Sequence, residues 1–185
     1  MKHAEATAAT RAALIQSFCQ LYEALPLEKI TVKEISDGAR VSRVTFYNYF
    51  SDPYQLIEEL EDDVIDTLVD NARFTIASGL DPEVFAEVFI ETFEGRKPLV
   101  KMLFAGSHSG VFVNKAKDAV IELIKPMITN YDTNPFERYA VEYHVSGMVA
   151  VFQRWFGDGK ENTDQMASII TEILLNSPLA SIVKE

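Results

Sequence analysis

Cysteine is almost missing from this sequence of 185 residues, which contains only Cys19. A single cysteine excludes a disulfide framework within the chain and agrees with a reducing compartment, so we expect a cytoplasmic protein. Cys19 lies among Phe18, Leu21 and Tyr22 in an apolar stretch. A small buried core residue is therefore expected at this position, with redox sensing as the alternative.

Long apolar runs and basic residues are also scarce. No stretch approaches the roughly 20 apolar residues that cross a membrane, and the N-terminus lacks the apolar core of a signal peptide, so no membrane partner is expected. The formal net charge is −11. Residues 1–55 hold six basic and six acidic residues, so the remaining chain carries the whole negative charge. This balance excludes a broad basic surface for non-specific nucleic-acid binding, but it is compatible with a specific binder.

Motifs of common enzymes are absent from the sequence. There is no glycine-rich phosphate loop and no nucleophile elbow. The histidines His3, His108 and His144 are far apart, with no cysteine or carboxylate at ligand spacing. A zinc site formed by His108 and His144 is a weak alternative. We therefore expect no enzyme, no cofactor and no metal.

Helical patterns interrupted by proline and glycine cover nearly the whole chain. They predict helices at residues 4–24, 32–39, 43–50, 53–77, 83–93, 95–104, 111–131 (kinked at Pro126), 135–156 and 162–176. The expected fold class is all-α, with an N-terminal helix-turn-helix domain over residues 1–52. A long helix at 53–77 is expected to join it to a helical regulatory and dimerisation domain over residues 53–185.

The most informative segment is the helix-turn-helix pattern TVKEISDGARVSRVTFYNYF at residues 31–50. Thr31 and Glu34 have the spacing of a capping box, and Ser42 is a second N-cap. At 100° per residue, Phe46 and Phe50 share one face of the second helix. An ordinary pair of short core helices is the alternative interpretation.

The opposite face of this second helix suits the major groove of DNA. Thr45, Asn48 and Arg43 can reach base edges, and Val44 can contact a thymine methyl group. Tyr47, Tyr49 and Thr31 are better placed to donate to phosphates, which fix the register without sequence discrimination.

Residues 11–60 resemble the N-terminal domain of the TetR/AcrR family of transcriptional regulators. The resemblance is carried by Arg11, Ile30-Thr31-Val32, Ile35, Ala39, Val41-Ser42, Thr45-Phe46-Tyr47, Tyr49-Phe50 and Leu56. It implies a homodimeric repressor that binds a palindromic double-stranded DNA operator and is released by a small-molecule effector. The residues that it implies in DNA binding are Arg11, Thr31, Lys33, Ser42, Arg43, Val44, Thr45, Tyr47, Asn48 and Tyr49, whereas Phe46 corresponds to a core position.

Two departures from the family pattern leave an alternative open. Arg40 occupies the turn position where the family has glycine, and a left-handed backbone there would cost about 1 kcal/mol. The segment Ser51-Asp52-Pro53-Tyr54 lacks the lysine that often begins the fourth helix. The alternative is an interaction protein of the same fold that recruits a partner regulator instead of binding an operator itself.

The C-terminal part is expected to dimerise and to bind the effector. In the helix at 135–156, Phe136, Tyr139, Tyr143, Gly147, Val151 and Trp155 lie near one stripe. The resemblance implies a four-helix dimer interface with the final helix, through Tyr143, Gly147, Val151, Ile170 and Ile173, although the stripes could pack within their own chain. Aromatic-lined pockets are common between helices. The candidate effector-pocket residues are Phe89, Phe93, His108, Phe112, Tyr143 and His144.

Overall fold

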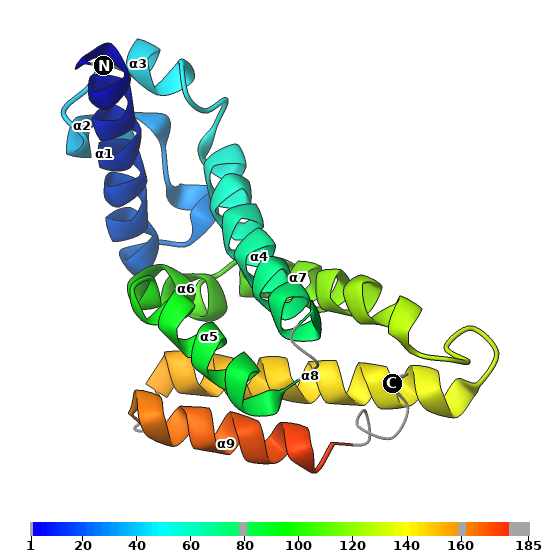
Figure 1. The fold of residues 1–185 in the computed structure, drawn as a ribbon. Coiled ribbons are helices and arrows are strands. Elements are labelled where there is room, and N and C mark those ends of the chain that lie inside the picture. Colours follow the sequence, from blue (N-terminus) through cyan, green and yellow to red (C-terminus); the bar gives the residue numbers. More distant parts are fainter. Residues whose placement is uncertain (1, 78–80, 159–161, 178–185) are drawn as a thin grey trace.

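A computed structural model describes the chain over residues 2–77, 81–158 and 162–177, and within these ranges it is helical and contains no strand (Figure 1). The expected all-α fold is therefore confirmed. In chain order the elements are α1 (Lys2–Ala24), η1 (Leu27–Lys29), α2 (Val32–Gly38), α3 (Arg43–Tyr47), α4 (Pro53–Ala77), α5 (Pro82–Glu94), α6 (Lys97–Ala105), α7 (Ser109–Ile124), η2 (Lys125–Met127), α8 (Pro135–Asp158) and α9 (Thr163–Leu175).

Helices α1 to α3 form the N-terminal head, which is held together by apolar side chains on one face of α1. Leu14, Phe18 and Tyr22 are buried there, and α2 contributes Ile35. Cys19 packs against the same cluster, and burial raises the pKa of its thiol to about 11. The thiol is therefore protonated at neutral pH, which favours the core interpretation over redox sensing.

Helix α3 is shorter than the sequence predicted. It ends at Tyr47 instead of Phe50, with Asn48 as its C-cap. The last turn tightens, because the N–H of Tyr49 donates to the carbonyl of Phe46 at 2.9 Å in the three-residue spacing of a 3-10 turn. Phe46 and Phe50 are nevertheless both buried as predicted.

Helix α4 has the predicted bounds and belongs to both parts of the molecule (Figure 1). Asp52 caps its first turn by accepting from the N–H of Gln55 at 2.9 Å, and proline is favoured at the first helical position. Leu56 is buried in the core near the head, and Val64 is buried two turns further along. One continuous buried cluster runs across the boundary that we predicted between residues 52 and 53.

Ion pairs connect α4 to the C-terminal body. The Nζ of Lys115 on α7 lies 3.2 Å from the carboxylate of the buried Glu61 and 3.3 Å from Asp62. Burial raises the pKa of Glu61, although Lys115 opposes this effect. Arg96, which immediately precedes α6, pairs with Asp63. These ion pairs therefore join α4 to α7 and to the residue that precedes α6.

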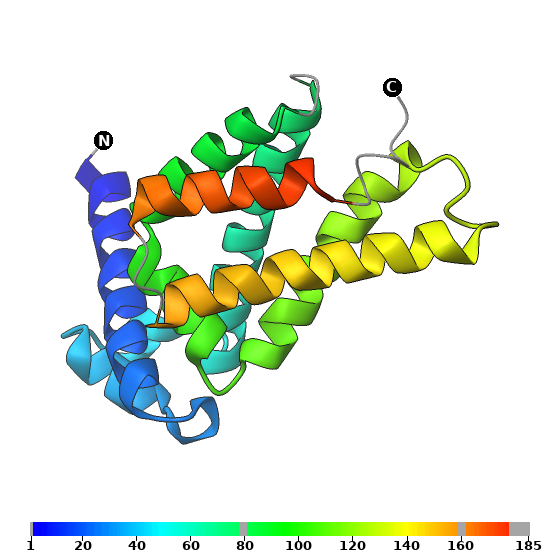
Figure 2. The same ribbon diagram turned by 90° about the horizontal axis from the view of Figure 1, so that it is seen from below.

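The body is built from α5 to α9, and Figure 2 shows it from below. Helix α9 packs against α5, α6 packs against α8, and α7 contacts both α4 and α8. Aromatic rings fill the space between them, with Phe89 stacked on Phe152 at 4.1 Å and Phe104 stacked on Phe156 at 5.8 Å between ring centroids. None of the helices in the described ranges is long and apolar enough to span a bilayer.

The predicted kinked helix at 111–131 is wrong in its second half. Helix α7 ends at Ile124, and Pro126 lies in the short 3-10 helix η2. Proline has no N–H to continue the α-helical hydrogen bonds, so the helix stops instead of bending. The following loop is held by Glu137, whose carboxylate accepts from the backbone N–H of Asn130 at 3.0 Å and from the side chain of Asn134 at 3.0 Å.

Candidate nucleic-acid interface

The outward face of α3 combines an apolar tip with polar neighbours. Val44 is 72% exposed and Tyr47 is 58% exposed, whereas Phe46 is fully buried between them in sequence. Arg43 and Asn48 are also exposed. In Figure 1, α3 lies at the tip of the head, away from the body. The structure therefore brings these four predicted DNA-contacting side chains together on one accessible surface, which we call the α3 face (Arg43, Val44, Tyr47 and Asn48).

The hydroxyl groups at the start of α3 are engaged with each other. Ser42 accepts from the backbone N–H of Thr45 at 3.0 Å, which confirms the predicted N-cap. The two hydroxyl oxygens lie 2.8 Å apart. Ser42 thus begins the helix, and Thr45 is oriented by this cap while remaining half-buried.

The start of α2 also has the predicted cap. Thr31 accepts from the N–H of Glu34 at 3.3 Å, and the Glu34 carboxylate accepts from the N–H of Thr31 at 3.0 Å. The Thr31 hydroxyl donates to the same carboxylate at 2.7 Å, and these bonds lower the pKa of Glu34. Lys33 is exposed beside this turn. The capping box therefore fixes the N-terminal end of α2.

Two further predicted DNA contacts are engaged within the chain. Arg11 pairs with Glu59 of α4 at 2.7 Å, and its guanidinium lies 5.5 Å from the centre of the Phe50 ring. The hydroxyl of Tyr49 donates to the carbonyl of Thr7 at 3.2 Å. Local sequence patterns do not reveal these roles, because both partners lie more than 40 residues away along the chain.

The cost of a left-handed backbone at Arg40 suggested a rearranged turn between α2 and α3, but the turn keeps the left-handed residue. Arg40 has a φ of 56°, which is uncommon for a residue with a side chain. Gly38 serves a different purpose: a Cβ there would lie 2.2 Å from the Ser17 hydroxyl oxygen. The Ser17 hydroxyl itself donates to the carbonyl of Ile35 at 2.9 Å, so glycine at position 38 lets α2 approach α1 closely.

We expect Arg40→Gly to raise the free energy of unfolding by about 1 kcal/mol, because glycine adopts the left-handed conformation without steric cost. In a chain of this size such a gain corresponds to an increase in melting temperature of roughly 2–4 °C. Thermal unfolding at one fixed protein concentration measures it. Arg40→Ala is the matched control, since it removes the charge but keeps the Cβ. An equal gain in both variants would show that charge, not backbone strain, is responsible.

The predicted effector-pocket residues do not share one site in the described chain. Phe89, Phe93 and Phe112 are buried in the aromatic core. His108 is half-buried, and its backbone N–H donates to the Tyr22 oxygen at 2.8 Å. Tyr143 is 74% exposed and therefore lies outside the core that holds the phenylalanines.

His144 has a structural role in the described chain. Its ring is buried, its Nδ1 lies 2.7 Å from the Ser177 hydroxyl, and burial lowers its pKa. The folded state therefore binds fewer protons than the unfolded state. We expect the stabilisation from His144 to be fully present above its unfolded pKa of about 6.5 and to be lost as the pH falls towards the lower folded pKa.

Urea denaturation between pH 5.5 and 7.5 tests this pH dependence. The wild-type chain is expected to lose more stability than His144→Gln on acidification, because glutamine keeps a hydrogen-bonding group but does not titrate. An identical loss in both proteins would assign the pH dependence to other groups.

The predicted dimer-interface residues divide into two groups. Ile170 is fully buried within the chain, so it is a core residue instead of an interface residue. Ile170 is buried because the apolar face of α9 packs against α5. Val151 and Ile173 are half-buried against the same core. Gly147 is exposed with no atom near its missing Cβ, and Tyr143 is exposed beside it.

An exposed aromatic strip lies on the first half of α8. Phe136 is 67%, Tyr139 66% and Tyr143 74% exposed. The predicted stripe continued to Trp155, but Trp155 is buried. With 3.6 residues per turn, residues spaced four apart drift around the helix, so the end of the stripe faces the core. We call Phe136, Tyr139, Tyr143 and Gly147 the α8 strip.

Comparisons with known proteins support the fold. Searches of family models and of curated proteins give no match to this sequence. Solved structures do match. A TetR transcriptional regulator from Streptococcus agalactiae has a TM-score of 0.63 and 18% identity, over 94% of this chain and 98% of that one. The dihydroxyacetone kinase operon activator DhaS has a TM-score of 0.60 and 16% identity, over 95% and 98%.

A third match is the TetR-family repressor FadR of Thermus thermophilus, solved in complex with lauroyl-CoA. Its TM-score is 0.53 and its identity is 19%, over 95% of this chain and 96% of that one. At these identities the matches show a common fold. The chain thus has the fold of TetR-family transcriptional regulators along nearly its whole length.

Proposed function

We propose that this chain is a sequence-specific DNA-binding transcriptional regulator of the TetR type. It binds a palindromic operator as a homodimer, acts as a repressor and is released by a small-molecule effector. The observation that carries this proposal is the α3 face: an exposed valine, arginine, tyrosine and asparagine over a fully buried Phe46. A helix with one exposed polar face and one buried apolar face can present side chains to bases, while the buried face holds it to the head.

The small number of cations near the α3 face and the negative charge of the whole chain support specific over non-specific DNA binding. The exposed cations near the α3 face are Lys33, Arg40 and Arg43, while Arg11 is paired with Glu59. The chain as a whole has a net charge of −11, which repels DNA at a distance. Affinity must then depend on fit and on base contacts, because a few cations neutralise few phosphates.

We expect a shallow salt dependence of operator binding. Each neutralised phosphate contributes about 0.9 to the slope of log affinity against log salt, so six cations in a dimer give a slope of about −5. Fluorescence anisotropy with a selected operator, titrated from about 50 to 300 mM salt, measures it. A slope steeper than about −9 would require contacts other than Lys33, Arg40 and Arg43.

Footprinting of the purified protein on genomic DNA of its source organism tests the regulator proposal in its natural context. We expect protected inverted repeats next to promoters, and the neighbouring genes would indicate the effector. Protection spread evenly over the genome, or absent from it, would count against the proposal.

The partner-recruiting alternative is favoured by one observation. Arg11 is paired with Glu59, and no lysine begins α4, so the head presents fewer free cations than the sequence pattern implied. Capture of a second DNA-binding protein by the α3 face, together with no intrinsic DNA binding at low salt, would favour this alternative.

A further inference from the structure

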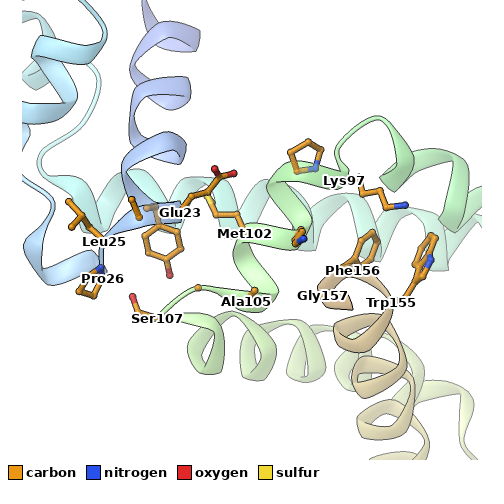
Figure 3. Close-up of a pocket in the computed structure, with 15 residues that line it drawn as sticks. Glu23, Leu25, Pro26, Lys97, Met102, Ala105, Ser107, Trp155, Phe156 and Gly157 are labelled. Carbon is orange, nitrogen blue, oxygen red and sulfur yellow. The ribbon is translucent and has the colours of Figure 1, made fainter. Parts of the chain in front are cut away.

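An open groove of about 870 Å³ crosses the junction between the head and the body (Figure 3). One wall is the end of α1 with the turn that follows it. The other walls are α6 with its following loop and the last residues of α8. None of the effector-pocket residues that we predicted from the sequence lines this groove.

One end of the groove is basic. Lys97 and Lys101 of α6 both line it, and the Nζ of Lys97 lies 5.1 Å from the centre of the Trp155 ring. Neither lysine forms an ion pair with any residue that the structure describes. Both cations therefore lie on one groove in a chain whose net charge is −11. They attract one anionic group to this end.

The remainder of the groove is mostly apolar. In Figure 3, Met102 and Ala105 lie between the Lys97 end and the opposite end, which is formed by Leu25 and Pro26. Glu23 lies on the α1 side and is exposed. Its carboxylate repels a second negative charge near α1, so the lining favours a ligand with one charged end and an apolar chain.

We propose that this groove binds an amphipathic monoanion. Its anionic group lies between Lys97 and Lys101, and its apolar chain follows Met102 and Ala105 towards Leu25. The apolar chain gains free energy by leaving water, and the lysines hold the charged group at the mouth of the groove, where it keeps part of its hydration.

The groove is adjacent to two hydrogen bonds that join the head to the body. The N–H of Leu27 donates to the Ser107 hydroxyl at 3.2 Å, and the N–H of His108 donates to the Tyr22 oxygen at 2.8 Å. A Cβ on Gly106 would lie 2.2 Å from the Tyr22 ring, so only glycine lets the loop approach α1 this closely. A ligand held beside this contact shifts the population of head orientations. This coupling rests on the proposed function, whereas binding itself does not.

Isothermal titration calorimetry with decanoate, without DNA, tests the binding step. We expect decanoate to bind at one site per chain. Three analogues serve as controls: decanol is uncharged, decyltrimethylammonium is a cation, and decanedioate carries a second negative charge. Each should bind at least tenfold more weakly than decanoate. Trp155 is the only tryptophan, so its fluorescence should change on saturation. No decanoate binding, or tighter binding of the cation, would overturn the proposal.

Variants locate the site. Lys97→Met and Lys101→Met keep the apolar stem and remove the charge, so each should weaken decanoate about fivefold to tenfold. Ala105→Phe should block the groove and abolish binding. Lys117→Met on α7, outside the groove, is the matched control and should bind as the wild type does. Unchanged affinity in all three groove variants would place decanoate elsewhere. Because no DNA is present, this failure is distinct from a failure to bind an operator.

Discussion

Val44→Glu is expected to abolish specific DNA binding while leaving the fold and the oligomeric state unchanged. Val44 is 72% exposed at the centre of the α3 face, so a carboxylate there faces solvent in the free protein and costs little stability. In the DNA complex the variant lacks the contact between Val44 and a base, and the new carboxylate is repelled by the phosphates. A contact to a base contributes about 1–3 kcal/mol and the dimer carries the change twice, so the lost contacts alone should lower the affinity by roughly 30-fold to 20,000-fold, and repulsion between the carboxylates and the phosphates lowers it further.

Fluorescence anisotropy with a selected operator measures this loss, and circular dichroism checks the helicity. Val111→Glu is the matched control: Val111 is an exposed valine on α7, far from the α3 face in the sequence and on a different part of the fold. It introduces the same charge, so it should bind within about twofold of the wild type. Wild-type affinity in Val44→Glu would show that α3 does not contact DNA.

Tyr143→Glu is expected to convert the proposed homodimer into monomers and thereby to weaken operator binding strongly. The Tyr143 side chain is 74% exposed next to the open Gly147 on α8, so the substitution leaves the monomer core intact. In a two-fold symmetric dimer the change occurs twice, and an interface tyrosine of this kind contributes about 2 kcal/mol or more. Dimer dissociation should therefore increase by at least about 1,000-fold.

Sedimentation equilibrium at micromolar concentration measures the oligomeric state. The control is Tyr54→Glu, which places the same charge at a 52% exposed tyrosine on α4 instead of α8. It should remain dimeric. We propose that the α8 strip forms the dimer interface. A wild-type protein that is already monomeric, or a Tyr143→Glu variant that is as dimeric as the control, would contradict this proposal.

Local sequence patterns predicted the head well, because its structure is decided by neighbours in the chain. The Thr31 capping box, the Ser42 cap and the bounds of α4 all depend on residues within one helical turn. The strained Arg40 differs from the rearranged turn that its cost suggested, because the surrounding turn holds the residue at a positive φ.

Long-range packing was not predictable in the same way. Ile170 and Tyr143 both belonged to apolar stripes, yet one is fully buried against α5 and the other is 74% exposed. An apolar stripe indicates that one face of a helix packs against another surface. It does not indicate whether that surface belongs to the same chain or to a second copy. The groove lined by Lys97 was missed for the same reason, since its walls come from three distant segments.

Selection of duplexes from a random DNA library, with the wild-type protein and Val44→Glu compared in parallel at about 50 mM salt, tests the central claim most directly. We expect the wild type to enrich a single inverted repeat whose half-sites lie about one helical turn apart, and Val44→Glu to enrich nothing. Enrichment of no sequence by the wild type, or of the same sequence by both proteins, would contradict the assignment of the α3 face as a sequence-specific DNA-binding surface.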